Sequence, residues 1–352
     1  MPVRQPTENL LRPPGGSGDA RRVRIRPIES TGDDFAAWYD VYLSARLADH
    51  PDGPQWLEHE LSVIYEGNAN HGVKLWLADD RDKAVGAAVL GLPLRDNLTL
   101  AEPEVYVRPE ESRRGIGGTL LATLDDAARE LGRTSQLIYL EGPTGADRTS
   151  GTAFAEKHAF TRRITEIARV QRPPFDLDGI ARAEEAARPL AEGYTIVGWR
   201  NHAPDEYVEE YARLEGRLST DAPLGDLDYE AEAWDVTRIR TGEERRGRMG
   251  RDTWTTAAMA PDGTMAGVTV IMLARDSDAT GFQDTTVVDP RHRGHRLGLL
   301  LKATNLRRVL ADRPGVQTVW TWNADSNAHM IAINEALGYR VAGWSAGYQR
   351  SL

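Results

Sequence analysis

Two short loops rich in glycine and arginine hold residue types suited to binding an anion. They are Ser112-Arg113-Arg114-Gly115-Ile116-Gly117-Gly118 and Arg293-Gly294-His295-Arg296-Leu297-Gly298. Each loop follows a strand-like apolar stretch and precedes a helical one. Successive backbone N–H groups in such a loop form a concave nest, the helix N-terminus adds unpaired donors, and glycine lets a phosphate approach the main chain. Both loops are therefore candidate pyrophosphate sites, with a plain strand-to-helix turn as the alternative for either loop alone.

Other known phosphate loops do not fit these sequences. A P-loop requires Gly-Lys-Ser/Thr, and neither loop contains lysine. A dinucleotide fingerprint requires a third glycine three residues after the second, where Leu120 and Leu301 stand, and an acidic residue after the next strand. The pattern therefore argues against ATP and NAD as ligands.

The two loops belong to an internal repeat that covers most of the 352 residues. Three pairs share one offset of 181 residues: Gly86 and Gly267, Pro109 and Pro290, and Gly117 and Gly298. A chain of this length accommodates two domains of about 100 to 200 residues. We predict a disordered tail at 1–21, one domain at 22–171, a linker at 172–192 with a short helix at 180–190, and a second domain at 193–352.

The same order of elements is predicted in each copy. It runs strand, helical stretch, two strands around a turn, strand, Gly/Arg loop, helix, strand, helix, strand. In the second copy Pro261-Asp262-Gly263 marks the turn, and an amphipathic stretch at 297–310 follows the loop directly. This mixed order predicts an α/β fold with a mixed sheet flanked by helices.

Composition excludes several classes of protein and site. The formal net charge of -10 disfavours a general nucleic-acid binder, and the absence of cysteine excludes disulfides, thiolate zinc sites and a cysteine nucleophile. The histidines His50, His59 and His71 lack metal-ligand spacing, so we expect no metal. No apolar run reaches the roughly 18 to 20 residues that span a bilayer. We expect a cytoplasmic protein with no membrane partner, and its arginine- and alanine-rich composition is typical of bacterial coding.

The pattern as a whole resembles the GNAT superfamily of acyl-CoA-dependent N-acyltransferases. The resemblance rests on the strand, Arg/Gly loop, helix and strand, followed by Asn327-x-x-Met330 and the closing Leu337-Gly338-Tyr339. It covers both copies, as in tandem two-domain members of the family. It implies a splayed sheet in each domain, acetyl-CoA or another acyl-CoA as co-substrate, and acyl transfer to the primary amine of a small molecule.

The resemblance assigns roles residue by residue. Main-chain amides from Arg293 to Gly298 would hold the CoA pyrophosphate, a splay between the strands at 286–288 and 318–323 would admit the pantetheine arm, and Asn323 and Asn327 would offer it polar contacts. The cofactor-binding set is Thr286, Val287, Val288, Arg293, Gly294, His295, Arg296, Leu297, Gly298, Asn323 and Asn327. The equivalents in the first copy are Val105, Tyr106, Val107, Arg113, Arg114, Gly115, Ile116, Gly117 and Gly118.

The chain departs from the family pattern at three places. Arg296 stands where the pattern has its first glycine, and Ser112 stands where it begins with arginine or glutamine. The tyrosine that often protonates the CoA thiolate in the family falls at Ala155 in the first copy and at Asn334 in the second. Asn334 is thus the candidate at that place. Because only the second copy keeps the Asn-x-x-Met segment, we predict that it is catalytic and that the first copy is structural, or a second CoA site without turnover.

Without a cysteine, the acceptor amine is expected to attack the thioester directly in a ternary complex. The attacking amine must be neutral, so a carboxylate should take its proton. Asp284, just before the strand at 285–288, is the candidate base, and Glu102 and Glu104 occupy that region of the first copy. A solvated acid at the start of a strand is the alternative for each.

Two charged segments allow more than one interpretation of the acceptor and of the acyl donor. Eleven acids between 200 and 236 suggest either a lip that attracts a cationic amine or a solvated helix face, the reading we favour. An apparent insertion of about ten residues holds Arg238, Arg240, Arg245, Arg246, Arg248 and Arg251. It is either a mobile loop or a dock for a carrier protein or aminoacyl-tRNA that donates the acyl group. A CoA-binding module without catalysis is the third alternative.

Overall fold

The computed structural model describes residues 23–146, 148–221 and 223–352, so the predicted tail lies outside the described residues. The first copy contains β1 (Arg24–Ile28), α1 (Gly32–Asp49), α2 (Glu58–Tyr65), β2 (His71–Asp80), β3 (Lys83–Pro93), β4 (Leu100–Val107), η1 (Pro109–Glu111), α3 (Ile116–Glu130), β5 (Ser135–Pro143), α4 (Ser150–Lys157) and β6 (Thr161–Gln171). The connecting segment contains α5 (Leu177–Ala187) and η2 (Arg188–Ala191). The second copy contains β7 (Thr195–Arg200), α6 (Asp205–Asp221), α7 (Val236–Arg248), β8 (Arg251–Met259), β9 (Met265–Ala274), β10 (Gly281–Val288), η3 (Pro290–His292), α8 (Leu297–Asp312), β11 (Val319–Ala324), α9 (Ala328–Ala336) and β12 (Arg340–Ser351).

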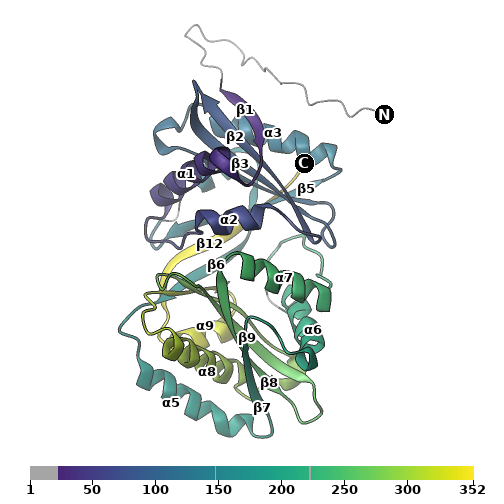
Figure 1. The fold of residues 1–352 in the computed structure, drawn as a ribbon, viewed down its shortest axis with the longest axis vertical. Coiled ribbons are helices and arrows are strands. Elements are labelled where there is room, and N and C mark those ends of the chain that lie inside the picture. Colours follow the sequence, from purple (N-terminus) through teal and green to yellow (C-terminus); the bar gives the residue numbers. More distant parts are fainter. Residues whose placement is uncertain (1–22, 147, 222) are drawn as a thin grey trace.

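All twelve strands of the described chain form one mixed sheet, in the order β1-β2-β3-β4-β5-β12-β6-β11-β10-β9-β8-β7. The last strand of each copy lies across the boundary between the copies: β12 pairs with β5, and β6 pairs with β11. Figure 1 shows β12 and β6 crossing between the two halves, with the C-terminus beside the first copy. The predicted α/β fold with helices on a mixed sheet is confirmed. The sequence repeat at 22–171 and 193–352 did not indicate this exchange of strands.

Both copies open where the parallel pair of strands diverges. Strand β4 pairs with β5 only at Leu100 and Ala101, and β10 pairs with β11 only at Gly281 and Phe282. Beyond these residues the strands separate, which leaves one edge of residues 286–288 unpaired with β11. The splay inferred from the family resemblance is therefore present in each copy.

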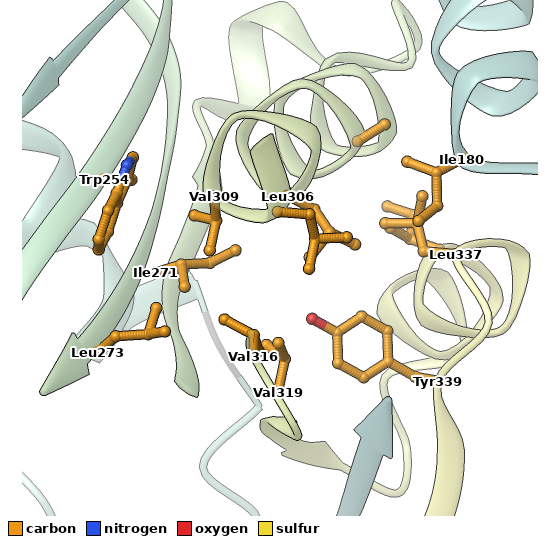
Figure 2. Close-up of a cluster of buried hydrophobic side chains, with 13 residues drawn as sticks. Ile180, Trp254, Ile271, Leu273, Leu306, Val309, Val316, Val319, Leu337 and Tyr339 are labelled. Carbon is orange, nitrogen blue, oxygen red and sulfur yellow. The ribbon is translucent and has the colours of Figure 1, made fainter. Parts of the chain in front are cut away.

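The connecting segment is part of the second copy's core. Its helix runs from 177 to 187 and so begins three residues earlier than predicted. Ile180 is buried in the cluster shown in Figure 2, where Leu306 and Val309 of α8 meet Val319 of β11. Glu184 forms an ion pair with Arg307 of α8, with 2.6 Å between the guanidinium nitrogen and the carboxylate oxygen. This segment therefore stabilises the helix that carries the second loop.

The apparent arginine insertion is corrected by the order of elements. Each copy has two helices between its first and second strands, so α7 takes the place of α2. The second copy does hold extra residues between its first two strands, at 201–250 against 29–70, but its arginines lie on the helix α7 rather than on a mobile loop.

Candidate functional site

A cleft of about 730 Å³ opens in the second copy beside the splay of β10 and β11. Of the residues predicted to bind the cofactor, it is lined by Thr286, Val287, Val288, Arg293, Gly294, Arg296, Leu297, Gly298 and Asn327. The lining also includes residues the sequence did not indicate: Leu218, Asp221, Pro223, His292, Ser326, Ala328, His329, Met330 and Ile333. Most of these extra residues come from the end of α6 and the start of α9. The fold thus brings three separated segments to one site.

The loop that begins α8 presents its backbone to this cleft. Gly294 and Arg296 have φ angles of 87° and 52°, in the left-handed region. Arg113 and Gly115 of the first copy, one repeat earlier, have φ angles of 62° and 87°. The chain path is therefore the same in both copies. The position of Arg296 requires a left-handed backbone conformation, which arginine adopts here, and does not require glycine. Within this fully described loop no side chain caps α8, so the N–H groups of its first turn remain available to an anion.

Four residues predicted for the second copy are absent from the cleft lining: His295, Asn323, Asn334 and Asp284, which is described below. His295 Nδ1 is 3.0 Å from the carbonyl oxygen of Leu190, and its ring packs against Tyr194. Asn323 and Asn334 are buried in the core. Neither amide lines the cleft in this structure, so a contact of Asn323 with the pantetheine arm and a role for Asn334 at the tyrosine position stay predictions.

The two buried asparagines belong to a polar chain. Lys302 Nζ donates to Asn334 Oδ1 at 2.8 Å, and Asn334 Nδ2 donates to Asn323 Oδ1 at 3.1 Å. Arg169 Nη1, from the exchanged strand β6, donates to the same oxygen at 3.2 Å. Burial lowers the pKa of Lys302 to about 7. The chain holds α8, α9 and β11 together beneath the cleft, which accounts for Asn334 structurally.

The loop of the first copy has the same shape but different neighbours. Arg114 forms ion pairs with Glu111 and with Asp80. A Cβ atom at Gly117 would lie 3.2 Å from the ring of Phe154, whereas at Gly298 it would lie 3.2 Å from Ile333. The ring of Phe154 and the ion-paired Arg114 thus lie next to the first loop. The predicted first-copy residues therefore form a loop of the same shape, and each loop has one arginine paired with a carboxylate: Arg114 in the first copy and Arg293, 3.6 Å from Asp221, in the second.

The remaining first-copy residues belong to β4. The side chains of Val105 and Val107 pack into a core cluster with Ile116, and Tyr106 packs edge-on against Tyr42 with ring centroids 5.1 Å apart. Gly118 stands opposite His158, whose ring would be 3.8 Å from an added Cβ. These residues lie together around the first loop.

Comparisons with known proteins agree with this geometry. The Acetyltransferase (GNAT) family matches residues 35–160. The mycothiol acetyltransferase of Salinispora arenicola (strain CNS-205) is 28% identical over 323 residues, which cover 89% of this chain and 92% of that protein. A tandem GNAT protein from the clavulanic acid biosynthesis pathway superposes with a TM-score of 0.74 at 27% identity, over 94% of this chain and 98% of that one. A GCN5-related N-acetyltransferase from Sphaerobacter thermophilus shares the fold, with a TM-score of 0.64 at 17% identity over 94% and 95% of the two chains.

The chain is similar to tandem GNAT proteins along nearly its whole length. The predictions of the superfamily, of its tandem form and of an acyltransferase activity are thereby confirmed, and acetyl-CoA is the co-substrate that this fold uses. The second copy fits that co-substrate by an observation of its own, since the uncapped first turn of α8 and the left-handed loop line a cleft of suitable size. Within the described ranges, no helix is long and apolar enough to cross a membrane. Those ranges also hold no group of three or more His, Asp or Glu side chains placed to bind a metal.

Two carboxylates lie close in sequence to residues that line the cleft, Asp284 near Thr286 and Glu215 near Leu218. Asp284 is exposed in an irregular part of β10, where the register with β9 shifts between Gln283 and Thr286. Glu215 of α6 is 6% exposed, and Thr285 Oγ1 donates to its Oε2 at 3.1 Å. Burial, and then the charge of Asp284, raises the pKa of Glu215 to about 7. A carboxylate with a pKa near neutrality suits a general base.

Sequence reasoning counted Glu215 among eleven acids and did not single it out. The position of Glu215 on α6 could have indicated its burial. It lies on the same helical face as the buried Val208, Tyr211 and Leu214, whereas most of the other acids lie outside that face. A glutamate at an apolar position of an amphipathic helix has to be desolvated, which raises its pKa. Leu218, one turn later, lines the cleft.

The arginines around α7 are mostly engaged by acids. Arg238 pairs with Asp96 and Glu232, Arg240 with Asp205 and Glu243, Arg248 with Glu66, and Arg251 with Glu60. Arg245 and Arg246 are half-buried and have no such partner among the described residues. A macromolecular donor docked on this helix would have to displace existing ion pairs.

Proposed function

We propose that this protein transfers the acetyl group of acetyl-CoA to the primary amine of a small molecule, directly and within a ternary complex, in its second copy. The observation that carries the proposal is a single cleft with an uncapped anion-binding loop along one wall and a near-neutral carboxylate one helical turn from another. Both halves of the reaction therefore have residues at one site.

The loop and strand residues would bind and orient the co-substrate. Backbone N–H groups at 293–298 would hold its pyrophosphate, as they point an uncapped helix end at the cleft. The free edge of Thr286 to Val288, beyond the last pair with β11, offers backbone groups to the pantetheine amides in the way an added strand would. Bound in this manner, acetyl-CoA supplies an activated thioester, and attack by the amine forms a C–N bond, breaks the C–S bond and releases the CoA thiolate.

Glu215 and Asp284 would prepare the acceptor. An amine arrives as a cation, which the two carboxylates attract. Glu215 Oε1 has no hydrogen-bond partner among the described residues and so remains free to take a proton from the ammonium group. Asp284, nearer to solvent, contributes the negative charge that keeps the pKa of Glu215 high. We assign Glu215 as the base and Asp284 as the residue that sets its pKa.

The first copy, residues 22–171, would act as a structural partner of the second, residues 193–352. It supplies β6, which pairs with β11 along Val319–Ala324 and forms one wall beneath the site. Its own loop arginine, Arg114, is held by two carboxylates. The catalytic copy is therefore incomplete without the strand it receives from the first.

The test uses the purified full chain. Calorimetry should show acetyl-CoA and CoA binding in the micromolar range, with no strong competition from ATP or NAD. A thiol reagent should report CoA release when an acceptor amine is present, without background because the protein has no cysteine. Tight ATP binding with no acetyl-CoA binding would overturn the proposal.

A further inference from the structure

Arg245 and Arg246 stand apart from the other arginines of α7. No hydrogen bond or ion pair joins either side chain to another described residue, and the Nε atom of each is withdrawn from solvent without a partner. Arg238, Arg240 and Arg248, on the same helix, all reach acids. A half-buried cation without a partner is costly, so a site that keeps two of them is arranged for an anion that arrives with a ligand.

The phase of α7 turns one of these cations toward the acceptor side. Ile239 is 2% exposed and packs in the same cluster as Tyr211 of α6 and Val287 of β10. Arg246 lies seven residues, or two turns, beyond Ile239 and therefore shares its inward face. Tyr211 is one turn before Glu215 on α6. The inner faces of α6 and α7 thus carry a carboxylate and a guanidinium into the same space.

The electrostatic effects on the pKa values of Glu215 and Arg245 are consistent with this arrangement, after burial, which is the largest cause of the shift for both groups. The pKa of Glu215 responds to the charges of both Asp284 and Arg246, and the pKa of Arg245 responds to Arg246 and Asp284. Yet the described structure pairs neither arginine with either acid. Two half-buried guanidinium groups without ion-pair partners and a buried carboxylate with an unpartnered oxygen therefore lie on the packed elements α6 and α7, next to β10.

We propose that the acceptor is an amine that also carries a carboxylate, an amino-acid-type zwitterion, with its ammonium group at Glu215 and Asp284 and its carboxylate at Arg245 and Arg246. The planar guanidinium matches a carboxylate with two parallel hydrogen bonds, which fixes orientation as well as charge. This inference rests on the proposed function, because it names the substrate class of the same site.

The first test compares matched acceptors at saturating acetyl-CoA. Each set contains an amino acid, its amide and its decarboxylated amine, for example ornithine, ornithinamide and putrescine, or tyrosine, tyrosinamide and tyramine. Release of CoA thiol should give a kcat/KM at least 100-fold higher for the carboxylated member of a set. Phosphoethanolamine tests a phosphate in place of the carboxylate, and faster turnover of it than of every amino acid would overturn the assignment of a carboxylate.

Two other outcomes would also overturn the inference: amides or decarboxylated amines turned over as well as the acids, or no turnover of any carboxylated acceptor. Neither depends on co-substrate binding, which calorimetry with acetyl-CoA reports separately. Loss of acetyl-CoA binding would instead count against the proposed function.

The second test changes the arginines. The double variant Arg245→Gln, Arg246→Gln should raise the KM of the preferred acceptor about 100-fold, abolish the preference for acid over amide and leave the Kd of acetyl-CoA unchanged. Arg248→Gln is the matched control, because it removes the same charge from the same helix at an exposed residue paired with Glu66, and it should keep the preference. Arg246→Lys keeps the charge without the planar fork and should recover part of the KM if the double variant is unstable. Equal losses for acid and amide would show a structural role and sink the inference.

Discussion

In the first copy Tyr65 and Tyr106 direct their hydroxyl groups to one oxygen of Glu104, whereas in the second copy the hydroxyl of Thr285 donates to one oxygen of the buried Glu215. Counted from the first residues of their helices, Tyr42 in α1 and Glu215 in α6 occupy the same position, the eleventh. An aromatic ring fills in one copy the place where the other has a carboxylate. The comparison teaches that one backbone can bury an aromatic ring in the first copy and, at the same place in the second, the carboxylate that we propose as the base.

The loops differ in the same direction. Glu110 and Glu111 precede the first loop where Arg291 and His292 precede the second, and Glu111 binds Arg114. The Acetyltransferase (GNAT) family nevertheless matches the first copy, at residues 35–160. Gly115 and Gly117 in that copy keep the glycine spacing of the family, which a sequence comparison weighs directly. It does not weigh whether the charges around the loop are already neutralised.

The strongest way to break the comparison is to block each loop in turn. Gly298→Glu places a negative side chain beside the proposed pyrophosphate site. Losing even two charge-assisted hydrogen bonds of about 1.5 to 3 kcal/mol each should lower acetyl-CoA affinity at least a hundredfold. Gly117→Glu should leave turnover near that of the wild type if the first copy is structural. Calorimetry with acetyl-CoA and the CoA-release assay measure both.

The two glycines are well matched as controls for folding. An added Cβ would contact Ile333 at 3.2 Å in one case and Phe154 at 3.2 Å in the other. Both variants should therefore lose similar stability, and both melting temperatures have to be measured. A folded Gly117→Glu protein without activity, beside an active Gly298→Glu protein, would reverse the assignment of the catalytic copy.

A comparable but more specific effect is expected at Glu215. Glu215→Gln removes the proposed base, so kcat should fall by about 10² to 10⁴ fold. In the wild type, kcat/KM should rise with pH through about 7, as Glu215 ionises. The groups acting on that pKa are Asp284, Arg246, Tyr211 and Thr285. A pH–rate profile of Glu215→Gln that kept the same rising limb would remove Glu215 from this role.

The same substitution should stabilise the protein. Because the folded-state pKa of Glu215 is raised above its ordinary value of 4.5, the wild type loses stability as pH rises from about 4.5 to about 7. Glutamine carries no such cost, so at pH 8 the variant should gain about 1 to 3 kcal/mol, and the gain should vanish near pH 4. Melting curves at the two pH values test this.

Asp284→Asn sharpens the assignment further. Removing its charge should lower the pKa of Glu215, since that charge is the second cause of the shift after burial. The rising limb of the pH–rate profile should move to lower pH, and kcat at pH 8 should fall by less than about tenfold. A greater loss than in Glu215→Gln would exchange the roles of the two acids.

The sequence predicts those parts of the site that depend on the spacing of neighbouring residues, and it misses those that depend on contacts between residues distant in sequence. The repeat, the loops and the order of strands and helices follow from residue spacing, and the tandem fold was predicted from them. The exchange of β6 and β12 between the copies could not be predicted, because each strand has a suitable neighbour in its own copy. Glu215 and the inward turn of Asn323 and Asn334 were missed for a related reason. A side chain's burial depends on partners such as Arg169 and Lys302, which are distant in sequence.

The smallest effect on activity is expected beneath the site, where the copies differ in polarity. Lys302 and Asn334 occupy the places that Leu121 and Ala155 hold in the first copy, in an apolar cluster. Burial depresses the pKa of Lys302 from 10.5 to about 7, so the unfolded chain binds more protons between these values and the wild type should gain stability as pH rises from 7 toward 10. The double variant Lys302→Leu, Asn334→Ala copies the first copy's residues and should lose this pH dependence, melting higher than the wild type near pH 7. Because neither side chain lines the cleft, its acetyl-CoA affinity and kcat should stay within about threefold of wild type. A drop in kcat of more than tenfold in a folded double variant would instead return Asn334 to the reaction itself.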